Sequence, residues 1–569
     1  MAVEFLQVQK KTSSYADAMI AVGLAHLILD ISSHTGVSRK VEVVDKGDIY
    51  SIKMSPELNE FELDEWKPNP GFPYIQLKKD DTEVPVGSIN YEMAREVEKT
   101  YREAIKANSK KNKKEERILR EQGLEGIEKP RPDLPVLKTF NSMRMGSDAY
   151  NKLNKAIRET PGIKDILLDK LSNYGFTGQP QHKFSDATLE SIVSPLQLFN
   201  PIAGKGVNRP KPDSTGAASV SPKLVDWFEE WMKYRALYLG LLSYNCGNDG
   251  KDTKIMFIAP GEISVGQIQI LRDKLLEKKV WGSTSAWLDI QATLLLAKIL
   301  IEHSEELGQG ETIFRFKAKK PNKVVKGFYS TYFKNLGTAS AVMNVSFVGL
   351  PDWLPIRNAE EASHWLEIIK EHEDCLKSLE ESHSSDVPLL LKYRDFISSG
   401  NLTEFLDFLA LYAIHFMQCK AQNKWVLAFT TTNLRRLFMD STKEIIENQG
   451  FQNIATAIRK ATINAQIRKS MTGKSPFEIH YGLAQNWKRR AKFKHQFIAE
   501  LSNFVQEYNN ENARHAEQGK ETRKNITTVD LKQIIDLIEN EKYGSELVCM
   551  LLLAFGYARA PQEDEENNA

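Results

Sequence analysis

The longest run of apolar residues in the chain lies near its N-terminus, from Ala18 to Leu29. It follows Ser13 and Ser14, which favour the position just before the first turn of a helix. The run is too short for a bilayer, which requires about 20 apolar residues. We therefore expect a buried helix here. The next stretch, VEVVDKGDIYSIKMS, alternates apolar and polar residues around Gly47, and this pattern predicts a β-hairpin.

The middle of the chain combines helical and strand-like patterns, which predicts an α+β arrangement. Helices are expected around 147–173, after Pro222, up to about Lys279 and from Thr284 to His303. Strands are expected at KIMFIAPG (254–261), TIFRFKAKK, VVKGFYSTYF and ASAVMNVSFVGL, because β-branched and aromatic residues dominate there. The Pro-rich segment 129–138 indicates a linker. Residues 176–223 are rich in Gly, Pro, Ser and Asn and predict an irregular region.

Nearly all of the chain from Asn401 onward has the period of a helix. One helix carries a single apolar stripe of Phe451, Ile454, Ala455, Ile458, Thr462 and Ala465. Another is expected to begin at SPFE, with Ser475 as N-cap and Glu478 completing a capping box. Its buried face would comprise Phe477, Tyr481, Ala484, Trp487 and Ala491, extended by Ile498, Leu501, Val505 and Tyr508. Thr527 and Asp530 predict a further cap, and SELVCMLLLAFGYAR predicts a fully buried helix.

These patterns predict a multidomain α+β protein of three regions. Residues 1–135 form an N-terminal α+β region with a charged helical arm, and residues 136–400 form a central α+β region. Residues 401–569 form an all-α helical bundle and end in the acidic segment EDEENNA.

Composition fits a globular protein of 569 residues with a net charge of +1. The four cysteines, Cys246, Cys375, Cys419 and Cys549, form no CxxC pair, so we expect buried free thiols in a reducing setting. The N-terminal sequence lacks the basic-then-apolar order of a signal peptide. We therefore expect a soluble, cytoplasmic protein without a membrane partner.

The overall charge conceals a strongly basic segment. Residues 451–494 hold ten bases and one acid, Glu478. Nine of these bases are predicted to contact a nucleic-acid backbone: Arg459, Lys460, Arg468, Lys469, Lys488, Arg489, Arg490, Lys492 and Lys494. Lys488, Lys492 and His495 would share one helical face, where like charges repel unless a polyanion relieves them. The alternative is a solvated basic face without a ligand.

Two other stretches suggest contact with nucleic acid. The run KANSKKNKKEER places Lys110, Lys111, Lys113 and Lys114 on a charged arm, which is either a phosphate-contacting arm or simply a solvated helix. The loop LFNPIAGKGVNRPKPD combines glycines with amide and basic donors: Asn200, Lys205, Asn208, Arg209 and Lys211. It lacks the spacing of a P-loop. It is a nucleic-acid-sensing loop or a purely structural one.

Motifs for catalysis are sparse, so no catalytic residue, metal ligand or cofactor is predicted. His364, Glu367, His372 and Cys375 fall on one expected helix, but their spacing and acidic surroundings favour a solvated helix over a metal site. A nuclease whose carboxylates come from distant positions stays open as an alternative.

The C-terminal stretches FQNIATAIRKATINAQIRK, FEIHYGLAQNWKRRAKFKHQFIAELSNFVQEYNNENAR, ITTVDLKQIIDLI and LLLAFGYARA resemble the large subunits of type I-B-like CRISPR Cascade complexes. The helix YADAMIAVGLAHLILDI and the loop FNPIAGKGVNRPKPD are also similar to that family. The resemblance implies a non-catalytic subunit that binds near the 5′ end of a guide RNA, senses the protospacer-adjacent motif and stabilises the R-loop. It also implies that residues 401–569 resemble the Cascade small subunit, for which Met417 and Met439 are potential internal starts.

The implied partners are a guide RNA, double-stranded target DNA, and the Cascade backbone and small subunits. A helicase-nuclease would join them in antiviral defence, or transposition proteins in a CRISPR-associated transposon. Besides the nuclease, a general RNA-binding scaffold remains an alternative.

Overall fold

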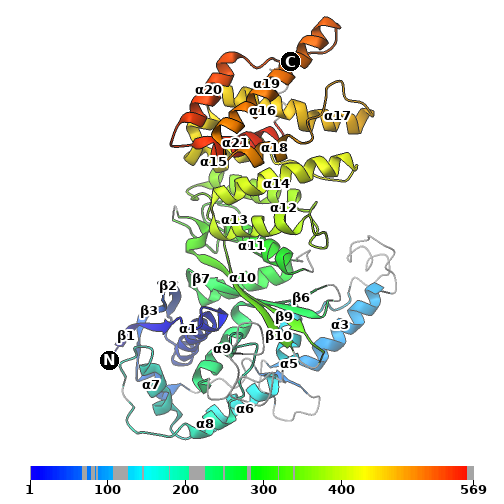
Figure 1. Cartoon of the computed structure of the whole chain (residues 1–569). Coiled ribbons are helices and arrows are strands. Elements are labelled where there is room, and N and C mark those ends of the chain that lie inside the picture. The colour runs from blue at the N-terminus through cyan, green and yellow to red at the C-terminus, as the bar shows by residue number, and fades with distance from the viewer. Residues whose placement is uncertain are drawn as a thin grey trace. The chain divides into compact units, whose positions relative to one another are not determined.

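The structure is a computed structural model in which the chain forms two compact units. It describes residues 2–66, 74–77, 84, 88–106, 126–143, 146–178, 180–203, 225–247, 250–278, 284–317, 319–337 and 340–560. Unit 1 comprises Met1–Glu305, Gly310–Phe316 and Pro321–Leu350. Unit 2 comprises Glu306–Gln309, Lys317–Lys320 and Pro351–Ala569. Unit 1 mixes helices and strands, and the described elements of unit 2 are helical (Figure 1), as the expected α+β class with a helical C-terminal region requires.

The expected divisions after residues 135 and 400 both fall inside a unit. Pro135 lies in the first turn of a helix, α5 (Leu134–Ser142), where a missing N–H costs nothing. The Oγ1 of Thr139 on that helix lies 2.6 Å from the Oγ of Ser243 on a strand of unit 1. Gly400 adopts a left-handed conformation that ends α13 (Val387–Ser399), and the next helix begins two residues later. Pro135 and Gly400 therefore mark helix ends, and both lie inside a compact unit.

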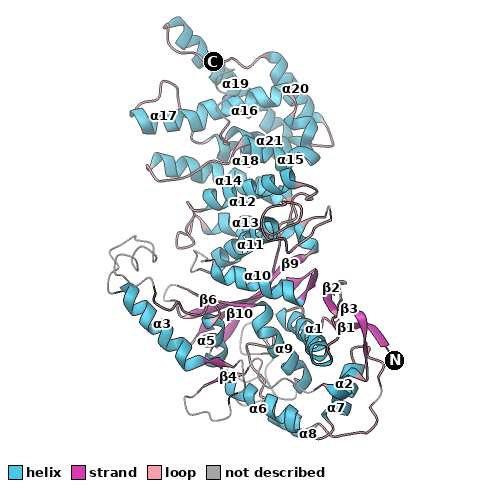
Figure 2. Ribbon diagram, turned by 180° about the vertical axis from the view of Figure 1, so that it is seen from behind, coloured by secondary structure: helices cyan, strands magenta, loops and turns pink. Residues whose placement is uncertain are grey.

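Two four-stranded sheets organise unit 1, and Figure 2 shows their strands in magenta. The first has the order β1 (Ala2–Gln9), β3 (Ile49–Asn59), β2 (Lys40–Asp45), β8 (Glu262–Ser264), all antiparallel. The second has the order β10 (Ser340–Gly349), β9 (Val325–Asn335), β7 (Asp252–Pro260), β6 (Leu241–Cys246), also antiparallel. A short parallel pair joins β4 (Ile75–Gln76) to β5 (Ile89–Asn90). The chain passes directly from β7 to β8 through Gly261, so one continuous segment serves both sheets.

The expected buried helix and hairpin are both confirmed. Helix α1 (Tyr15–Thr35) begins at the N-cap Ser14, and nearly all of its first two-thirds is buried. It is long and apolar enough to cross a membrane, but it packs as a core helix against α9 (Trp227–Gly240) and both sheets. A Cβ at Gly23 would lie 1.9 Å from the carbonyl oxygen of Met232, so the two helices touch backbone to backbone there. The β2–β3 turn contains Gly47 at φ 94°.

The strand expected at TIFRFKAKK is absent. Phe314 and Phe316 are buried, as an alternating pattern predicts. Apart from an isolated bridge between Phe314 and Ser304, however, no strand forms at the described residues of this segment. Its backbone bonds instead to the loop after α11, where the N–H groups of Ile313 and Phe314 donate to the carbonyl of His303. The alternation therefore predicted burial correctly and pairing incorrectly.

The remaining helices of unit 1 surround the sheets and the α1–α9 pair. The expected helix over 147–173 divides into two at Pro161 and Gly162. Those helices and the others of unit 1 are α2 (Glu62–Glu65), α3 (Tyr91–Lys106), α6 (Gly146–Glu159), α7 (Ile163–Ser172), α8 (Ala187–Ile192), α10 (Val265–Glu277), α11 (Ser285–Glu302) and the 3₁₀ turn η2 (Pro321–Lys323).

Unit 2 buries a continuous aromatic and aliphatic core. Its further elements are α12 (Ala359–Leu376), α14 (Leu402–Ala421), α15 (Thr431–Ile446), α16 (Gln449–Arg459), the π-helical turn η3 (Lys460–Asn464), α17 (Ala465–Thr472), α18 (Leu483–Arg490), α19 (Lys494–Glu517), α20 (Thr528–Glu539) and α21 (Gly544–Gly556). All six residues of the expected α16–α17 stripe are buried. The capping box of Thr527 and Asp530 forms, and α21 is buried over most of its length.

The helix expected to start at SPFE begins seven positions later, at Leu483. The Ser475 hydroxyl accepts from the N–H of Phe477 and donates to its carbonyl, so it closes a local turn and caps no helix. The Glu478 N–H donates to Glu511, 2.6 Å away on α19. Phe477 and Trp487 are buried as expected, but Tyr481 is 45% exposed.

Candidate nucleic-acid interface

The basic segment 451–494 forms α16, η3, α17 and α18 of unit 2 and the loops between them. The rest of this unit has the opposite charge. Residues 351–450 contain ten bases and sixteen acids, and residues 495–560 contain seven bases and ten acids. The charge surplus of the segment is therefore offset by its own unit, and the contribution of each cation depends on its neighbours.

Four of the predicted contact residues are paired with carboxylates from outside the segment. Lys488 pairs with Asp407 on α14 at 3.2 Å, and Arg490 pairs with Glu500 on α19 at 3.1 Å. Arg468 pairs with Glu521 in the α19–α20 connection at 2.8 Å, and Lys494 pairs with Glu539 on α20 at 2.8 Å. Exposed ion pairs of this kind contribute little to stability, about 0–1 kcal/mol. They do lower the charge that a nucleic-acid strand would encounter at these positions.

Arg459 is a structural residue. Its side chain is buried, and its guanidinium donates to the carbonyl of Ala558 at 2.6 Å and to that of Phe555 at 2.9 Å. These carbonyls lie at the end of α21 and just beyond it, where a helix has no internal donors to offer. Arg459 therefore fixes the end of α21 against α16.

The common face expected for Lys488, Lys492 and His495 does not form. Helix α18 ends at Arg490, and Phe493, the residue just before α19, has an extended ψ of 95°. Lys492 thus lies in the break between two helices. A shared face at this spacing requires one continuous helix. Here the helix is interrupted between Lys488 and His495, at residues 491–493.

Exposed aromatic rings accompany the remaining cations. Lys469 on α17 lies 5.8 Å from the ring centre of Tyr481, and its Nζ is 3.4 Å from the Tyr481 hydroxyl. Phe493 is 58% exposed and stands between Lys492 and Lys494 in the chain. Rings on which bases stack, next to cations that meet the backbone, are the components of single-strand binding surfaces.

The side chains of three exposed bases in the segment make no hydrogen bond or ion pair to any described residue. These are Lys474, Arg489 and Lys492. Together with Lys469 they form the set of exposed cations without a carboxylate partner among the described residues. We refer to Lys469, Lys474, Arg489 and Lys492, with Tyr481 and Phe493, as the aromatic–basic set.

The loop predicted to sense a DNA motif is described only at its start. Asn200 is half-buried and fully engaged: its amide nitrogen donates to the Leu196 carbonyl and to Glu230, and its oxygen accepts from Lys233. It therefore anchors the loop to α9 and is not positioned to reach a ligand. Lys205, Asn208, Arg209 and Lys211 lie outside the described residues. So do Lys110, Lys111, Lys113 and Lys114 of the charged arm, which α3 precedes.

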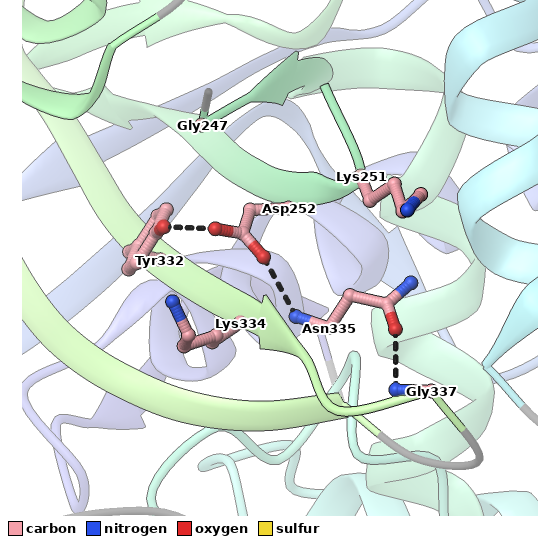
Figure 3. A pocket seen from close by; sticks show the side chains of 7 residues that line it. All are labelled: Gly247, Lys251, Asp252, Tyr332, Lys334, Asn335 and Gly337. Carbon is pink, nitrogen blue, oxygen red and sulfur yellow. Dashed lines mark hydrogen bonds between the residues drawn. The ribbon is translucent and has the colours of Figure 1, made fainter. Parts of the chain in front are cut away.

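A pocket of about 540 Å³ lies in unit 1 at one end of the second sheet (Figure 3). Asp252 accepts a hydrogen bond from the Tyr332 hydroxyl and another, 2.8 Å long, from the Asn335 N–H. These bonds tie β7 to the last residues of β9. The pocket therefore lies at a hydrogen-bonded end of the sheet.

A cysteine, a histidine and an aspartate lie close together in unit 2. The Sγ of Cys419 is 3.4 Å from Nε2 of His415, and Nδ1 of His415 is 3.6 Å from Asp386. Burial raises the pKa of the Cys419 thiol and lowers the pKa of His415. Both shifts favour the neutral thiol and neutral imidazole, whereas a nucleophilic cysteine needs its thiolate.

The predicted solvated helix over His364, Glu367, His372 and Cys375 is wrong for two of the four. His372 and Cys375 are buried on α12, and Nδ1 of His372 lies 2.8 Å from the Tyr393 hydroxyl. No grouping of His, Cys, Asp or Glu that could hold a metal ion occurs among the described residues.

No protein-family model matches this chain, and no curated protein matches it.

The sequence patterns do not single out Tyr481 and Phe493 as candidate binding residues. The SPFE motif predicts a helix start, and that start places Tyr481 on a buried face. A simpler signal exists: an aromatic ring lies within a few positions of lysine and arginine in a segment broken by Gly473, Gly482 and Pro476. Such breaks place rings in loops, where they need not be buried.

Proposed function

We propose that this chain is a non-catalytic, nucleic-acid-binding large subunit of a Cascade-type, RNA-guided DNA-binding complex. In this role unit 1 would sense the protospacer-adjacent motif through the loop at 198–213. Residues 401–569 of unit 2 would act in the manner of a small subunit and hold a single strand of the R-loop. Its partners would be a guide RNA, target DNA and the Cascade backbone and small subunits, with either helicase-nuclease or transposition proteins.

The observation that carries the nucleic-acid-binding part of the proposal is the aromatic–basic set. Tyr481 and Phe493 expose their rings, and each accompanies a cation without a carboxylate partner among the described residues: Lys469 lies over the Tyr481 ring, and Lys492 precedes Phe493 in the chain. A single strand would engage both kinds of group, because its bases stack on rings and its phosphates pair with cations. The RNA-guided part of the proposal depends on the sequence resemblance.

The binding surface is tested by fluorescence anisotropy of the full chain with a labelled oligodeoxythymidine strand over a range of salt concentrations. We expect Tyr481→Ala and Phe493→Ala each to weaken binding about tenfold, since stacking contributes about 1–3 kcal/mol per base. Phe61→Ala is the matched control, because Phe61 is 66% exposed but lies between Glu60 and Glu62. Equal effects of Phe61→Ala and Phe493→Ala would refute the assignment.

The charge contribution is tested separately. Replacing Lys474, Arg489 and Lys492 by Gln should reduce the slope of log affinity against log salt by about 0.7 for each phosphate that the variant no longer neutralises. Replacing the paired residues Arg468 and Lys494 by Gln should change the slope less. If both variants lower the slope in proportion to their charge, the ion pairs seen in the structure do not govern binding.

The RNA-guided role requires assembly. The chain is co-expressed with the expected backbone subunits and a guide RNA, and binding to a matched duplex is compared with binding to one whose adjacent motif is scrambled. Binding that needs both this chain and the motif supports the proposal. Failure of the chain to join the complex would leave a general RNA-binding scaffold as the better account.

A further inference from the structure

A second pocket of unit 2, about 420 Å³ in volume, lies between α15, α16 and the segment before α20. Its described lining residues include no Asp or Glu. They include four basic residues: Arg435, Arg459, Lys460 and Lys524. Amides and hydroxyls supply most of its other polar groups, including those of Thr456 and Asn464. We call this cavity the basic pocket.

The basic pocket is formed by the polar side of the helix whose other side is buried. Gln452 and Thr456 on α16 and Lys460, the first residue of η3, recur every four residues, opposite the buried stripe that includes Ile454 and Ile458. The π-helical turn Lys460–Asn464 then places Asn464 in the lining as well. Single π turns within α-helices occur frequently at functional sites.

Donors in the pocket are available to a ligand. The side chains of Arg435, Thr456 and Asn464 make no hydrogen bond or ion pair to any other described residue. Lys524 lies 3.5 Å from the amide oxygen of Asn453 and also interacts electrostatically with Asp530, which accepts from the Asn453 amide nitrogen. The pocket therefore presents positive charge and unused hydrogen-bond donors in one small volume.

The absence of acidic residues from the described lining of the basic pocket does not extend to an adjoining pocket of about 1210 Å³. It shares Asn464 and Ala560 with the basic pocket, but its lining includes Glu367, Glu371 and Asp374. Arg436, next in sequence to Arg435, pairs there with Glu367. Neighbouring arginines on one helix thus face different environments, one with a carboxylate partner and one without.

We propose that the basic pocket binds a phosphate ester. Arg435 and Lys524 would neutralise its charge, and Thr456 and Asn464 would donate to its oxygens, since charge-assisted hydrogen bonds to phosphate are the strong ones. The phosphate could belong to a nucleic-acid strand or to a free nucleotide. The site is separate from the aromatic–basic set and does not depend on the proposed function.

The test uses the full chain and two probes, inorganic pyrophosphate and a labelled oligodeoxythymidine strand. The pocket variant is Arg435→Gln with Lys524→Gln. The control variant, Lys443→Gln with Lys520→Gln, makes the same charge change on α15 and before α20, at positions that do not line the pocket. All four side chains are exposed, and thermal melting of both variants verifies that they fold.

We expect the wild type to bind pyrophosphate in calorimetry, and the pocket variant to bind at least about tenfold more weakly than the control. If the pocket variant also loses strand affinity to that extent, a strand supplies the phosphate. If strand binding is unchanged, a free phosphate compound is the ligand. Equal losses in the two variants, or no pyrophosphate binding by the wild type, would overturn the proposal. Absence of strand binding alone would count only against the proposed function.

Discussion

His372 should make unit 2 sensitive to acid. Its imidazole is fully buried on α12, and ring centres of Trp353 and Phe405 lie 5.1 and 5.0 Å from its own. Burial lowers its pKa from 6.5 to about 3. Its Nε2 has no hydrogen-bond partner among the described residues, so a proton placed there would find no acceptor.

The sign and size of the pH effect on unfolding follow from the pKa of His372 in the unfolded chain, 6.5, and in the folded chain, about 3. Below pH 6.5 the unfolded chain takes up a proton that the folded chain excludes, so the free energy of unfolding falls as the pH falls. The loss is about 1.4 kcal/mol per pH unit and ends near the folded pKa of about 3. Between pH 7.5 and 4.5 His372 alone should cost about 2.7 kcal/mol.

The substitution His372→Gln removes the titrating group. At neutral pH the variant should be less stable, by about 1–3 kcal/mol, because ring packing and the bond to Tyr393 are lost. As the pH falls to 4.5, its deficit should shrink by about 2.7 kcal/mol, since only the wild type loses the contribution of a neutral His372. Hydrogen exchange of peptides from α12 and α14, corrected for intrinsic rates, measures the opening free energy of this region.

The control is His364→Gln on the same helix, where the side chain is 30% exposed. It should follow the pH dependence of the wild type. An equal deficit of His372→Gln at pH 7.5 and 4.5 would contradict the prediction, because the buried imidazole would then accept a proton without cost.

Three further substitutions test individual packing contacts. Gly23→Ala should force α1 from the Met232 carbonyl and lower unit 1 stability by about 3 kcal/mol, seen as a lower melting temperature. Arg459→Met leaves two carbonyls of the α21 terminus without donors and should cost unit 2 about 3 kcal/mol in urea unfolding. Asp252→Ala should cost about 1–2 kcal/mol, and adding Tyr332→Phe should cost little more, because the alanine has already removed the acceptor of the Tyr332 hydroxyl; full additivity would contradict this.

The elements that could be predicted are those whose signals are local. Helix α1 has a cap and an apolar run within 20 positions, and the α16 stripe repeats at the helical period. Each such signal is complete within one element, so no long-range information is needed. TIFRFKAKK shows the limit, since burial of Phe314 follows from the pattern but its pairing depends on a distant strand.

The two compact units do not begin or end at Pro135 or Gly400, for a related reason. Proline and glycine mark places where a helix starts or stops, and a domain boundary is only one of the places where that happens. On either side of Gly400, the rings of Phe396 on α13 and Phe405 on α14 stack with centres 4.4 Å apart. This contact joins the two helices into one core. Whether helices on either side of a turn pack together is decided by their faces and not by the turn.

The candidate interface shows the same limit for charge. Ten bases within 44 positions suggested one basic surface, but Asp407, Glu500, Glu521 and Glu539 reach four of them from elements up to 81 positions away. A charge count along the chain cannot include these partners. The cations whose charge is not offset by a carboxylate are those that no distant acid approaches. In the basic pocket they include Arg435, which is separated in sequence from the basic segment. We therefore select the candidate anion-binding residues of this chain by the absence of a carboxylate partner in space, and not by the density of bases in sequence.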